Sequence, residues 1–416
     1  MQGSRAMTNS SLIFDDDYSH IWISECEDLG VIEQNIKLTD FEEKLKSINV
    51  DFEFRVLNRI TMTNVHSANM LPIECSMFGK NRVANYTPFQ KTQVILEHRQ
   101  HDSPLQSDTD KDKRIKDSMR RNSTGTIPQP QISPKKSLIN STVKMRFDEE
   151  SDSSQEENQK QIIVEDPSEW YINASYARHC FCKSMPDYVL LTQFPRQATL
   201  KKFFDMVSQK KVRQIVMLCK SNEKEIVEED HYFLKSPKIL TVGNYKVKCA
   251  KLEGNEFMSV RKLMIQRDAS ESARWDEFSV LHYKFKEWED FGVIEEKNFD
   301  AFFSAISKIH EEFLNNFEEK TKTKAHPSLL VHCRAGIGRS GCFAVIFFIY
   351  DYLFELKKIL ALNPELKIEE DSRFEISVFG ATRKVRECRW GAVDKPRQYF
   401  LIYQFTAYMI KKMFLV

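Results

Sequence analysis

A cysteine, a glycine-rich turn and an arginine follow one another in residues 331–341, at the spacing that binding of a phosphate group requires. The residues before the cysteine read as the end of a buried strand, and an apolar run follows the last glycine, which places the turn before a helix N-terminus. Backbone N–H groups of residues 334–339 can surround an anion there, and Arg339 can donate two hydrogen bonds to its oxygens. The same positive potential favours the thiolate of Cys333, whose thiol would otherwise titrate at about pH 8.5. These residue types predict a nucleophile that attacks phosphorus.

The full pattern is far more specific than a cysteine followed six positions later by an arginine. A histidine, the cysteine, two glycines, the arginine and a serine occupy fixed offsets between an apolar strand and an apolar helix. Such a pattern should arise by chance in well under about one in a thousand chains of average composition. The alternative interpretation, a buried cysteine in a tight glycine turn, leaves Arg339 without a function.

The loop resembles the signature loop of the cysteine-dependent protein tyrosine phosphatases, and further segments match that family in order along the chain. The matching segments are Lys80-Asn81-Arg82 with Pro88 for the phosphotyrosine loop, residues 171–176 and 192–195 for two core strands, residues 288–293 for the mobile acid loop, and Gln398-Tyr399 for the water-positioning segment. The resemblance covers roughly residues 38–416 apart from one insertion. It indicates the tyrosine-specific branch, because short dual-specificity relatives share the cysteine loop but not the upstream segments.

The pattern of apolar runs and the resemblance together predict an α/β fold, a strongly twisted mixed β-sheet with helices on both faces. Compact apolar strands are expected at residues 188–191 and 214–218, with a helix around residues 203–207 between them. The cysteine loop is expected at the C-terminal end of a strand, the usual place for a ligand site in an open sheet. The longest apolar stretch, residues 342–354, is too short to cross a bilayer of about 30 Å and is expected as a core helix.

Bulk composition excludes several classes of protein. The chain has 416 residues, 41% hydrophobic and 29% charged, which is enough for one large core or two ordinary ones. Its net charge of +1 and the lack of a basic–aromatic pattern argue against nucleic acid. The nine cysteines are scattered and the first residues lack an apolar signal sequence, so we expect a reducing, cytoplasmic compartment. Cys180 and Cys182 are close, but no second ligand pair lies at zinc spacing, so no metal or other cofactor is expected.

The organisation expected along the chain is a lead-in over residues 1–37 and a catalytic domain over residues 38–416. Residues 98–165 interrupt that domain with a polar segment that is expected to be disordered, because it has too few apolar residues to form a core. Its first half is basic and its second half acidic, and serines such as Ser123 and Ser151 lie in patterns that kinases prefer. Ser/Thr kinases are therefore candidate partners, although such short patterns arise often by chance.

The chemistry requires a nucleophile, a charge stabiliser and a proton donor. Cys333 is expected to attack phosphorus and form a thiophosphate, while Arg339 and the loop amides stabilise the equatorial oxygens. Asp290, in the segment that resembles the acid loop, is expected to protonate the leaving tyrosyl oxygen and then to act as base on the attacking water.

The remaining site residues are assigned by need or by the resemblance. The hydroxyl of Ser340 is expected to hydrogen-bond the departing thiolate, and His332 to order the loop. The resemblance implies that Glu223 orients Arg339, that Gln398 positions the water and that Trp288 belongs to the closing acid loop; Asp394 lies where a water-orienting glutamine is usual. The residues expected to contact substrate are Arg334, Ala335, Gly336, Ile337, Gly338, Val83 and Asn85.

The sequence departs from the family pattern at several positions. Glu289 and Ile294 replace prolines of the acid loop, which removes two φ restraints. Val83 lies where a tyrosine usually contacts the substrate ring, and an aromatic contact worth about 0.5–1.5 kcal/mol is lost. Asp394 and Glu228, in place of a glutamine and a lysine, add negative charge around an anionic site.

Three functions remain open at this point. The favoured one is hydrolysis of phosphotyrosine in proteins, with phosphotyrosine-containing proteins as partners. The second is a weakly active or inactive module that binds phosphotyrosine. The third is a phosphatase for a non-protein phosphate, because Val83 and Arg334 would widen and charge the mouth of the site.

Overall fold

The structure is a computed structural model that describes residues 34–66, 79–83, 86–89, 92–96, 171–181, 189–235, 237–268, 275–321 and 328–415. The chain divides into two units, Met1–Glu97 with Pro167–Val416, and His98–Asp166. The whole second unit, residues 1–33 of the expected lead-in, and Asn85 lie outside the described residues. The expectations for the polar insertion and its kinase patterns therefore stay predictions.

A mixed sheet of nine strands runs through the first unit, in the spatial order β2-β3-β4-β10-β5-β9-β8-β7-β6. The strands are β2 Gln93–Ile95, β3 Tyr171–Ala177, β4 Val189–Gln193, β5 Val212–Met217, β6 Ile239–Val242, β7 Tyr245–Gly254, β8 Met258–Asp268, β9 Trp275–Phe285 and β10 Ser328–Cys333. The four central strands β4, β10, β5 and β9 are parallel, and the outer pairs are antiparallel. The predicted mixed sheet is confirmed.

Burial explains why the central strands could be predicted from the sequence. Every residue of β4 is buried, as are four of the last five residues of β5, because helices cover both faces of the parallel part. The antiparallel ribbon of β7 alternates buried and exposed residues over its first half, as a strand with one covered face does.

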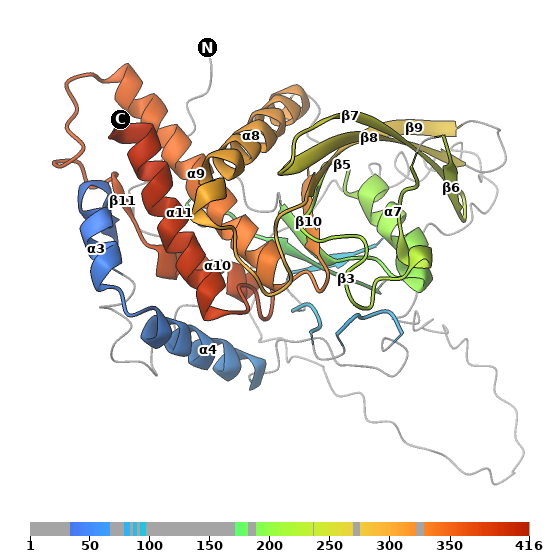
Figure 1. Cartoon of the computed structure of the whole chain (residues 1–416), viewed down its shortest axis with the longest axis horizontal. Helices are drawn as coiled ribbons and strands as arrows, with labels where there is room; N and C mark the ends of the chain where they lie inside the picture. Colours follow the sequence, from blue (N-terminus) through green and yellow to red (C-terminus); the bar gives the residue numbers. More distant parts are fainter. Residues whose placement is uncertain are drawn as a thin grey trace, which may run out of the picture. The chain divides into compact units, whose positions relative to one another are not determined.

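Helices lie on both faces of the sheet, with α8, α9, α10 and α11 together on one face and α7 on the other (Figure 1). The helices are α3 Phe41–Ser47, α4 Val50–His66, α7 Leu200–Gln209, α8 Phe299–Thr321, α9 Gly338–Leu362, α10 Val378–Cys388 and α11 Pro396–Phe414. Short 3₁₀ helices span Leu38–Asp40, Gln197–Thr199, Glu228–Asp230 and Glu296–Asn298. The predicted core helix is α9, which is buried from Arg339 to Leu353. None of the described helices is long and apolar enough to span a membrane.

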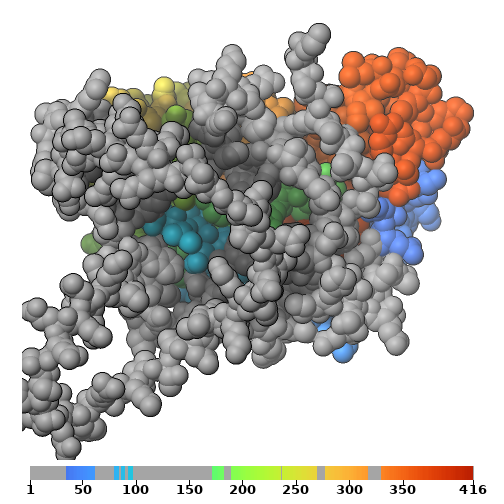
Figure 2. All heavy atoms as spheres, turned by 180° about the vertical axis from the view of Figure 1, so that it is seen from behind, coloured from blue at the N-terminus to red at the C-terminus, as the bar shows by residue number. Residues whose placement is uncertain are grey.

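Two peripheral segments join this core. Residues Ile36–Lys37 form β1, the end of the expected lead-in, and pair antiparallel with β11 Glu375–Ile376. Coloured atoms of residues 79–96, which include the segment from Lys80 to Pro88 that resembles a phosphotyrosine loop, reach the surface on the face seen in Figure 2. The elements that position the cysteine loop are therefore the C-terminal end of β10, between β4 and β5, and the N-terminus of α9.

Candidate active site

The cysteine loop connects β10 to α9 and is shaped by one glycine. Cys333 is the last residue of β10, is 3% exposed, and its Sγ accepts a hydrogen bond from the Gly336 N–H at 3.2 Å. Gly336 has φ +72°, and a Cβ there would lie 2.1 Å from the Thr192 carbonyl oxygen. Only glycine fits, because both the dihedral angle and the close approach to β4 exclude a side chain. The loop thus curls back over the sulfur and leads directly into the N-terminus of α9.

Arg389 lies beneath the loop and supports its backbone. Its Nε donates to the Gly336 carbonyl at 2.5 Å, while Nη1 and Nη2 donate to Ser175 Oγ at 3.1 Å and Asn173 Oδ1 at 2.8 Å. Burial lowers the pKa of Arg389 to about 10, against the opposing influence of Tyr171 and Cys333, so it remains a cation at neutral pH. Arg389 is not among the site residues predicted from the sequence. The signal was an arginine directly after the helix Val378–Cys388.

Arg339, one residue into α9, is a buried cation that donates to Glu223, Trp288 and Asp290. Its Nη1 and Nη2 donate to the two carboxylate oxygens of Glu223 at 2.6 and 2.7 Å, and Nη1 also donates to the Trp288 carbonyl at 3.0 Å. Burial disfavours the charged form, but Glu223 and Cys333 outweigh it, so the pKa of Arg339 lies above its ordinary value. The pairing that the resemblance implied between Glu223 and Arg339 is present in the structure.

The acid loop follows β9 and lies against the cysteine loop. Trp288 is buried, its Nε1 donates to the Gly292 carbonyl at 3.1 Å, and the Gly292 N–H donates to the Glu289 carbonyl at 3.0 Å. Asp290 faces two arginines: Oδ1 accepts from Arg339 Nη2 at 2.8 Å, and Oδ2 lies 3.1 Å from Arg334 Nε in an ion pair. The loop turn thus places the expected proton donor beside the expected phosphate ligand.

Gln398 and Asp394 lie on the far side of this turn. Gln398 is buried; its Nε2 donates to the Gly292 carbonyl at 3.4 Å and its Oε1 accepts from the Asp394 N–H at 3.2 Å. A Cβ on Gly338 would lie 2.8 Å from that Oε1, so the amide packs against the first residue of α9. The Asp394 carboxylate pairs with Lys395 Nζ at 3.0 Å, which offsets part of its negative charge.

His332 is held away from the sulfur by a buried hydrogen-bonded chain. Its Nε2 lies 2.8 Å from the Tyr232 hydroxyl, which is 2.6 Å from His282 Nε2, and its Nδ1 lies 3.3 Å from the Cys333 carbonyl. Burial lowers the pKa of His332 to about 3, so the imidazole is neutral at pH 7. The hydroxyl of Ser340, expected to contact the thiolate, is buried and has no hydrogen-bond partner among the described residues.

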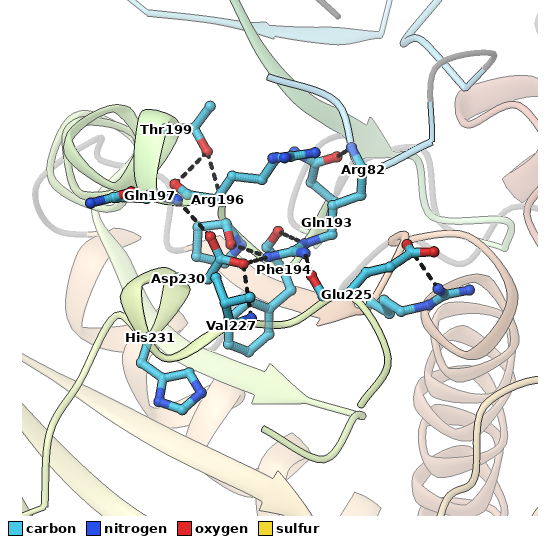
Figure 3. A network of polar contacts seen from close by, with 12 residues as sticks. Arg82, Gln193, Phe194, Arg196, Gln197, Thr199, Glu225, Val227, Asp230 and His231 are labelled. Carbon is cyan, nitrogen blue, oxygen red and sulfur yellow. Dashed lines mark hydrogen bonds and ion pairs between the residues drawn. The ribbon is translucent and has the colours of Figure 1, made fainter. Parts of the chain in front are cut away.

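Arg82 anchors the segment that resembles a phosphotyrosine loop (Figure 3). Its Nε donates to the Phe194 carbonyl at 2.7 Å, its Nη1 to the Glu225 carbonyl at 2.6 Å and its Nη2 to Asp230 Oδ2 at 2.7 Å. Burial raises the pKa of Asp230, but Arg82 and the Gln197 N–H outweigh it and the pKa lies below its usual range. This ion pair fixes the chain next to Val83, which is half-buried.

Tyr86 supplies an aromatic ring beside the cysteine loop that the sequence analysis did not consider. Its N–H donates to the Val83 carbonyl at 3.2 Å, so the two residues share one turn. A Cβ on Gly391, where φ is +73°, would lie 2.5 Å from Tyr86 Cε1 and 3.0 Å from Ile337 Cγ2. The signal was an aromatic residue three positions after the expected tyrosine.

The structure therefore brings together most of the residues chosen from sequence. Cys333, Arg339, Asp290, Glu223, Trp288 and Gln398 form one connected site at the C-terminal end of β10. The side chain of Arg334, expected to contact substrate, instead pairs with Glu225 Oε2 at 3.1 Å and with Asp290. Among the described residues, no group of three or more His, Cys, Asp and Glu side chains is placed to hold a metal ion.

Sequence comparison connects this site with a family of known proteins. The model of the protein-tyrosine phosphatase family matches residues 152–408. Receptor-type tyrosine-protein phosphatase alpha of Mus musculus is 26% identical over 238 residues, which cover 57% of this chain and 25% of that protein. Tyrosine-protein phosphatase non-receptor type 2 of Rattus norvegicus is 30% identical over 178 residues, 42% of this chain and 39% of that protein. The chain thus spans less than half the length of these relatives.

Solved structures share the fold. A structure described as the basis of the PTPN18 fingerprint on distinct HER2 tyrosine phosphorylation sites superposes with a TM-score of 0.57 at 18% identity, covering 90% of this chain and 99% of the other. PTPN18 in complex with HER2-pY1196 phosphopeptides gives a TM-score of 0.54 at 18% identity, with the same coverage. Identities this low show similarity of fold alone.

Proposed function

Because this chain belongs to the protein-tyrosine phosphatase family, we propose that it hydrolyses phosphotyrosine in proteins through a cysteinyl-phosphate intermediate. One observation carries the proposal: a buried cysteine, a buried arginine and an aspartate meet at the N-terminus of α9. Cys333 Sγ accepts from a loop amide at 3.2 Å, and Asp290 lies 2.8 Å from the Arg339 guanidinium. Each member of that set has a distinct part in a two-step displacement.

In the first step Cys333 Sγ forms a bond to phosphorus while the bond from phosphorus to the tyrosyl oxygen breaks. The loop amides and Arg339 stabilise the charge on the equatorial oxygens, and the N-terminus of α9 adds positive potential. Protonated Asp290 gives its proton to the departing tyrosyl oxygen. Glu223 holds both outer nitrogens of Arg339, so the guanidinium is already oriented before substrate arrives.

In the second step a water attacks phosphorus, the bond from sulfur to phosphorus breaks and inorganic phosphate leaves. Asp290, now a carboxylate, accepts the proton of that water. Gln398 is the residue we assign to position the water, because its amide packs against Gly338 and reaches the Gly292 carbonyl of the acid loop. The thiolate of Cys333 is regenerated.

A phosphate-release assay on purified protein tests this proposal. We expect release from a phosphotyrosine peptide, no release from the matched phosphoserine peptide, inhibition by vanadate and no loss in the presence of a chelator. Cys333→Ser is the control, because it keeps the loop but removes the nucleophile. Activity that survives Cys333→Ser, or that needs an added divalent metal, would refute the proposed mechanism.

A second candidate function is binding of phosphotyrosine without turnover. The hydrogen bonds of Arg339 favour this candidate. Its Nη2 donates to both Glu223 and Asp290, so a bound phosphate must displace Asp290 before this nitrogen can donate to the phosphate. Equal affinity of the native chain and Cys333→Ser for a phosphotyrosine peptide, with no phosphate released by either, would support this candidate. Preference for a phosphorylated lipid headgroup or sugar over the peptide in the same assay would support a non-protein substrate.

A further inference from the structure

Arg334 makes contacts that tie the acid loop to the rest of the site. Its side chain is 13% exposed, its Nη1 donates to Glu225 Oε2 at 3.1 Å, and its Nε forms the 3.1 Å ion pair with Asp290 Oδ2. Its guanidinium carbon also lies 5.8 Å from the centre of the Phe291 ring. One side chain of the cysteine loop therefore touches two consecutive residues of the acid loop.

The other end of this bridge is fixed. The Glu225 carbonyl accepts from Arg82 Nη1 at 2.6 Å, and Arg82 is held in turn by Asp230, as Figure 3 shows. Glu225 has φ +70°, a conformation costly for a residue with a side chain, so its surroundings must hold it in place. Arg334 thus connects Asp290 to an exposed loop residue, Glu225, whose backbone is held by Arg82.

The acid loop needs such support from outside. Glu289 occupies a position where a proline would restrain φ, and Phe291 has φ +55°. Side-chain contacts therefore do the restraining: Lys220 pairs with Glu289, and Lys395 Nζ lies 5.0 Å from the centre of the Phe291 ring. Of these cations, only Arg334 contacts the carboxylate of Asp290.

From this geometry we infer that Arg334 is a positioning residue, which holds Asp290 over the cysteine loop through its bridge to Glu225. The inference rests on the proposed function, because it assigns Asp290 the proton transfers. A planar guanidinium suits the task, since it can reach two carboxylates at once, whereas a lysine ammonium acts as a single point charge. Asp290 is then divided between two arginines: Arg339 releases Oδ1 when phosphate binds, and Arg334 keeps Oδ2.

Comparing kcat/KM for aryl phosphates with poor and good leaving groups shows whether a substitution misplaces the acid or disturbs the structure in general. In Arg334→Ala we expect kcat/KM for an aryl phosphate with a poor leaving group to fall about 10-fold, part of the full contribution of a positioned acid. With a good leaving group, which departs without a proton, the change should stay within about 2-fold. In an Asp290→Ala background the same substitution should cause no further loss, because the two residues act as a unit. Arg334→Lys should recover part of the loss.

Amide hydrogen exchange of the acid loop tests the same inference without turnover. In the ligand-free chain we expect residues 287–294 to exchange about 10-fold faster in Arg334→Ala than in the native protein. The matched control is Lys358→Ala, which removes a surface cation paired with Glu355 away from the site and should change neither readout. If the native chain releases no phosphate but the exchange difference is found, the proposed function fails while the loop contact stands.

Three results would overturn the inference. The first is unchanged exchange of the acid loop in Arg334→Ala. The second is an equal loss of kcat/KM with good and poor leaving groups. The third is a fall in affinity for the phosphotyrosine peptide with unchanged leaving-group dependence, which would make Arg334 a substrate-binding residue.

Discussion

At the scale of single residues, we expect Asp290 to be needed for turnover but not for binding of the phosphotyrosine substrate. The phosphate-binding groups, Arg339 and the amides of the cysteine loop, come from other elements and do not depend on this carboxylate. Replacing Asp290 with Ala should lower kcat by about 10²–10⁴-fold, the usual contribution of a positioned acid. Binding of a phosphotyrosine peptide should persist or strengthen, because Arg339 loses a competing carboxylate. Calorimetric titration beside steady-state kinetics measures both, and full turnover of a poor leaving group would show that another residue is the acid.

Asp394 lies next to the second step, because its N–H donates to Gln398, the residue that we assign to position the water. An ionised carboxylate can only accept hydrogen bonds, whereas the amide expected at this position would donate to the attacking water. Breakdown of the cysteinyl-phosphate should therefore be slow, and an aryl phosphate with a good leaving group should give a rapid burst of phenol followed by slow turnover. Asp394→Gln should speed the slow phase by a few-fold, since Lys395 already offsets part of the charge. Stopped-flow traces without a burst, unchanged in Asp394→Gln, would assign the water to Gln398 alone.

At the scale of elements, the parallel strands β9 and β10 each place a histidine against Tyr232, which follows the 3₁₀ helix Glu228–Asp230, and the three form a polar chain through the core. His282 of β9 and His332 of β10 both contact the Tyr232 hydroxyl and are fully buried. Burial lowers the pKa of both imidazoles, that of His332 to about 3. Each histidine is neutral in the folded protein but binds a proton in the unfolded chain below about pH 6.5. The two neutral histidines therefore contribute fully to the stability of the fold above about pH 6.5, and this contribution is lost as the pH falls toward 3.

Because the two histidines take up protons only in the unfolded chain, the free energy of unfolding should fall as the pH is lowered. Between pH 7 and pH 5 each buried neutral histidine should lower the free energy of unfolding by about 2 kcal/mol, because only the unfolded state takes up the proton. His282→Asn should be less stable at pH 7 and should lose about that much less stability on acidification. Urea unfolding of both proteins at the two pH values measures the difference. Identical pH dependence would mean that His282 is protonated in the folded state or that another group controls acid unfolding.

At the scale of the whole molecule, the polar segment interrupts two strands that pair with each other. β2 and β3 are antiparallel, and Ile95 lies opposite Tyr171 in the register. Ile95 and Tyr171 are therefore neighbours across the sheet, and a short loop can connect two antiparallel strands. We propose that the domain assignment holds, with residues 98–165 dispensable for folding of the catalytic domain.

Deletion of residues 98–165 with a short Gly/Ser bridge should then leave a soluble protein with one cooperative unfolding transition. Its kcat for an aryl phosphate should stay within about 2-fold of the full chain, because Cys333, Arg339 and Asp290 lie on elements outside the deleted segment. The control is the full chain at high and low salt, since opposite charges in the two halves of the segment respond to ionic strength. A salt-dependent rate in the full chain, absent after deletion, would instead give the segment a regulatory function.

The features that could be predicted from the sequence alone are those that depend on neighbouring residues. The strand, turn and helix around Cys333 were readable because their apolar runs and glycines act locally, and Gly336 proved to be a position where only glycine fits. The strands β4 and β5 and the core helix α9 were readable for a related reason. Elements covered on all sides carry continuous apolar runs, which identify them without any partner.

Which distant side chains meet depends on how the elements pack in three dimensions. Arg389 supports the carbonyl of Gly336 from 53 positions away, and Arg334 contacts Glu225 across 109 positions. Nothing within either local sequence specifies such a pair, because the contact depends on how β10, α10 and the loop after β5 pack against one another. The same holds for Tyr86, whose ring lies beside Gly391, next to which Ile337 also packs. Local pattern therefore identified the nucleophile and its loop, whereas packing decided what supports the loop and what holds the acid.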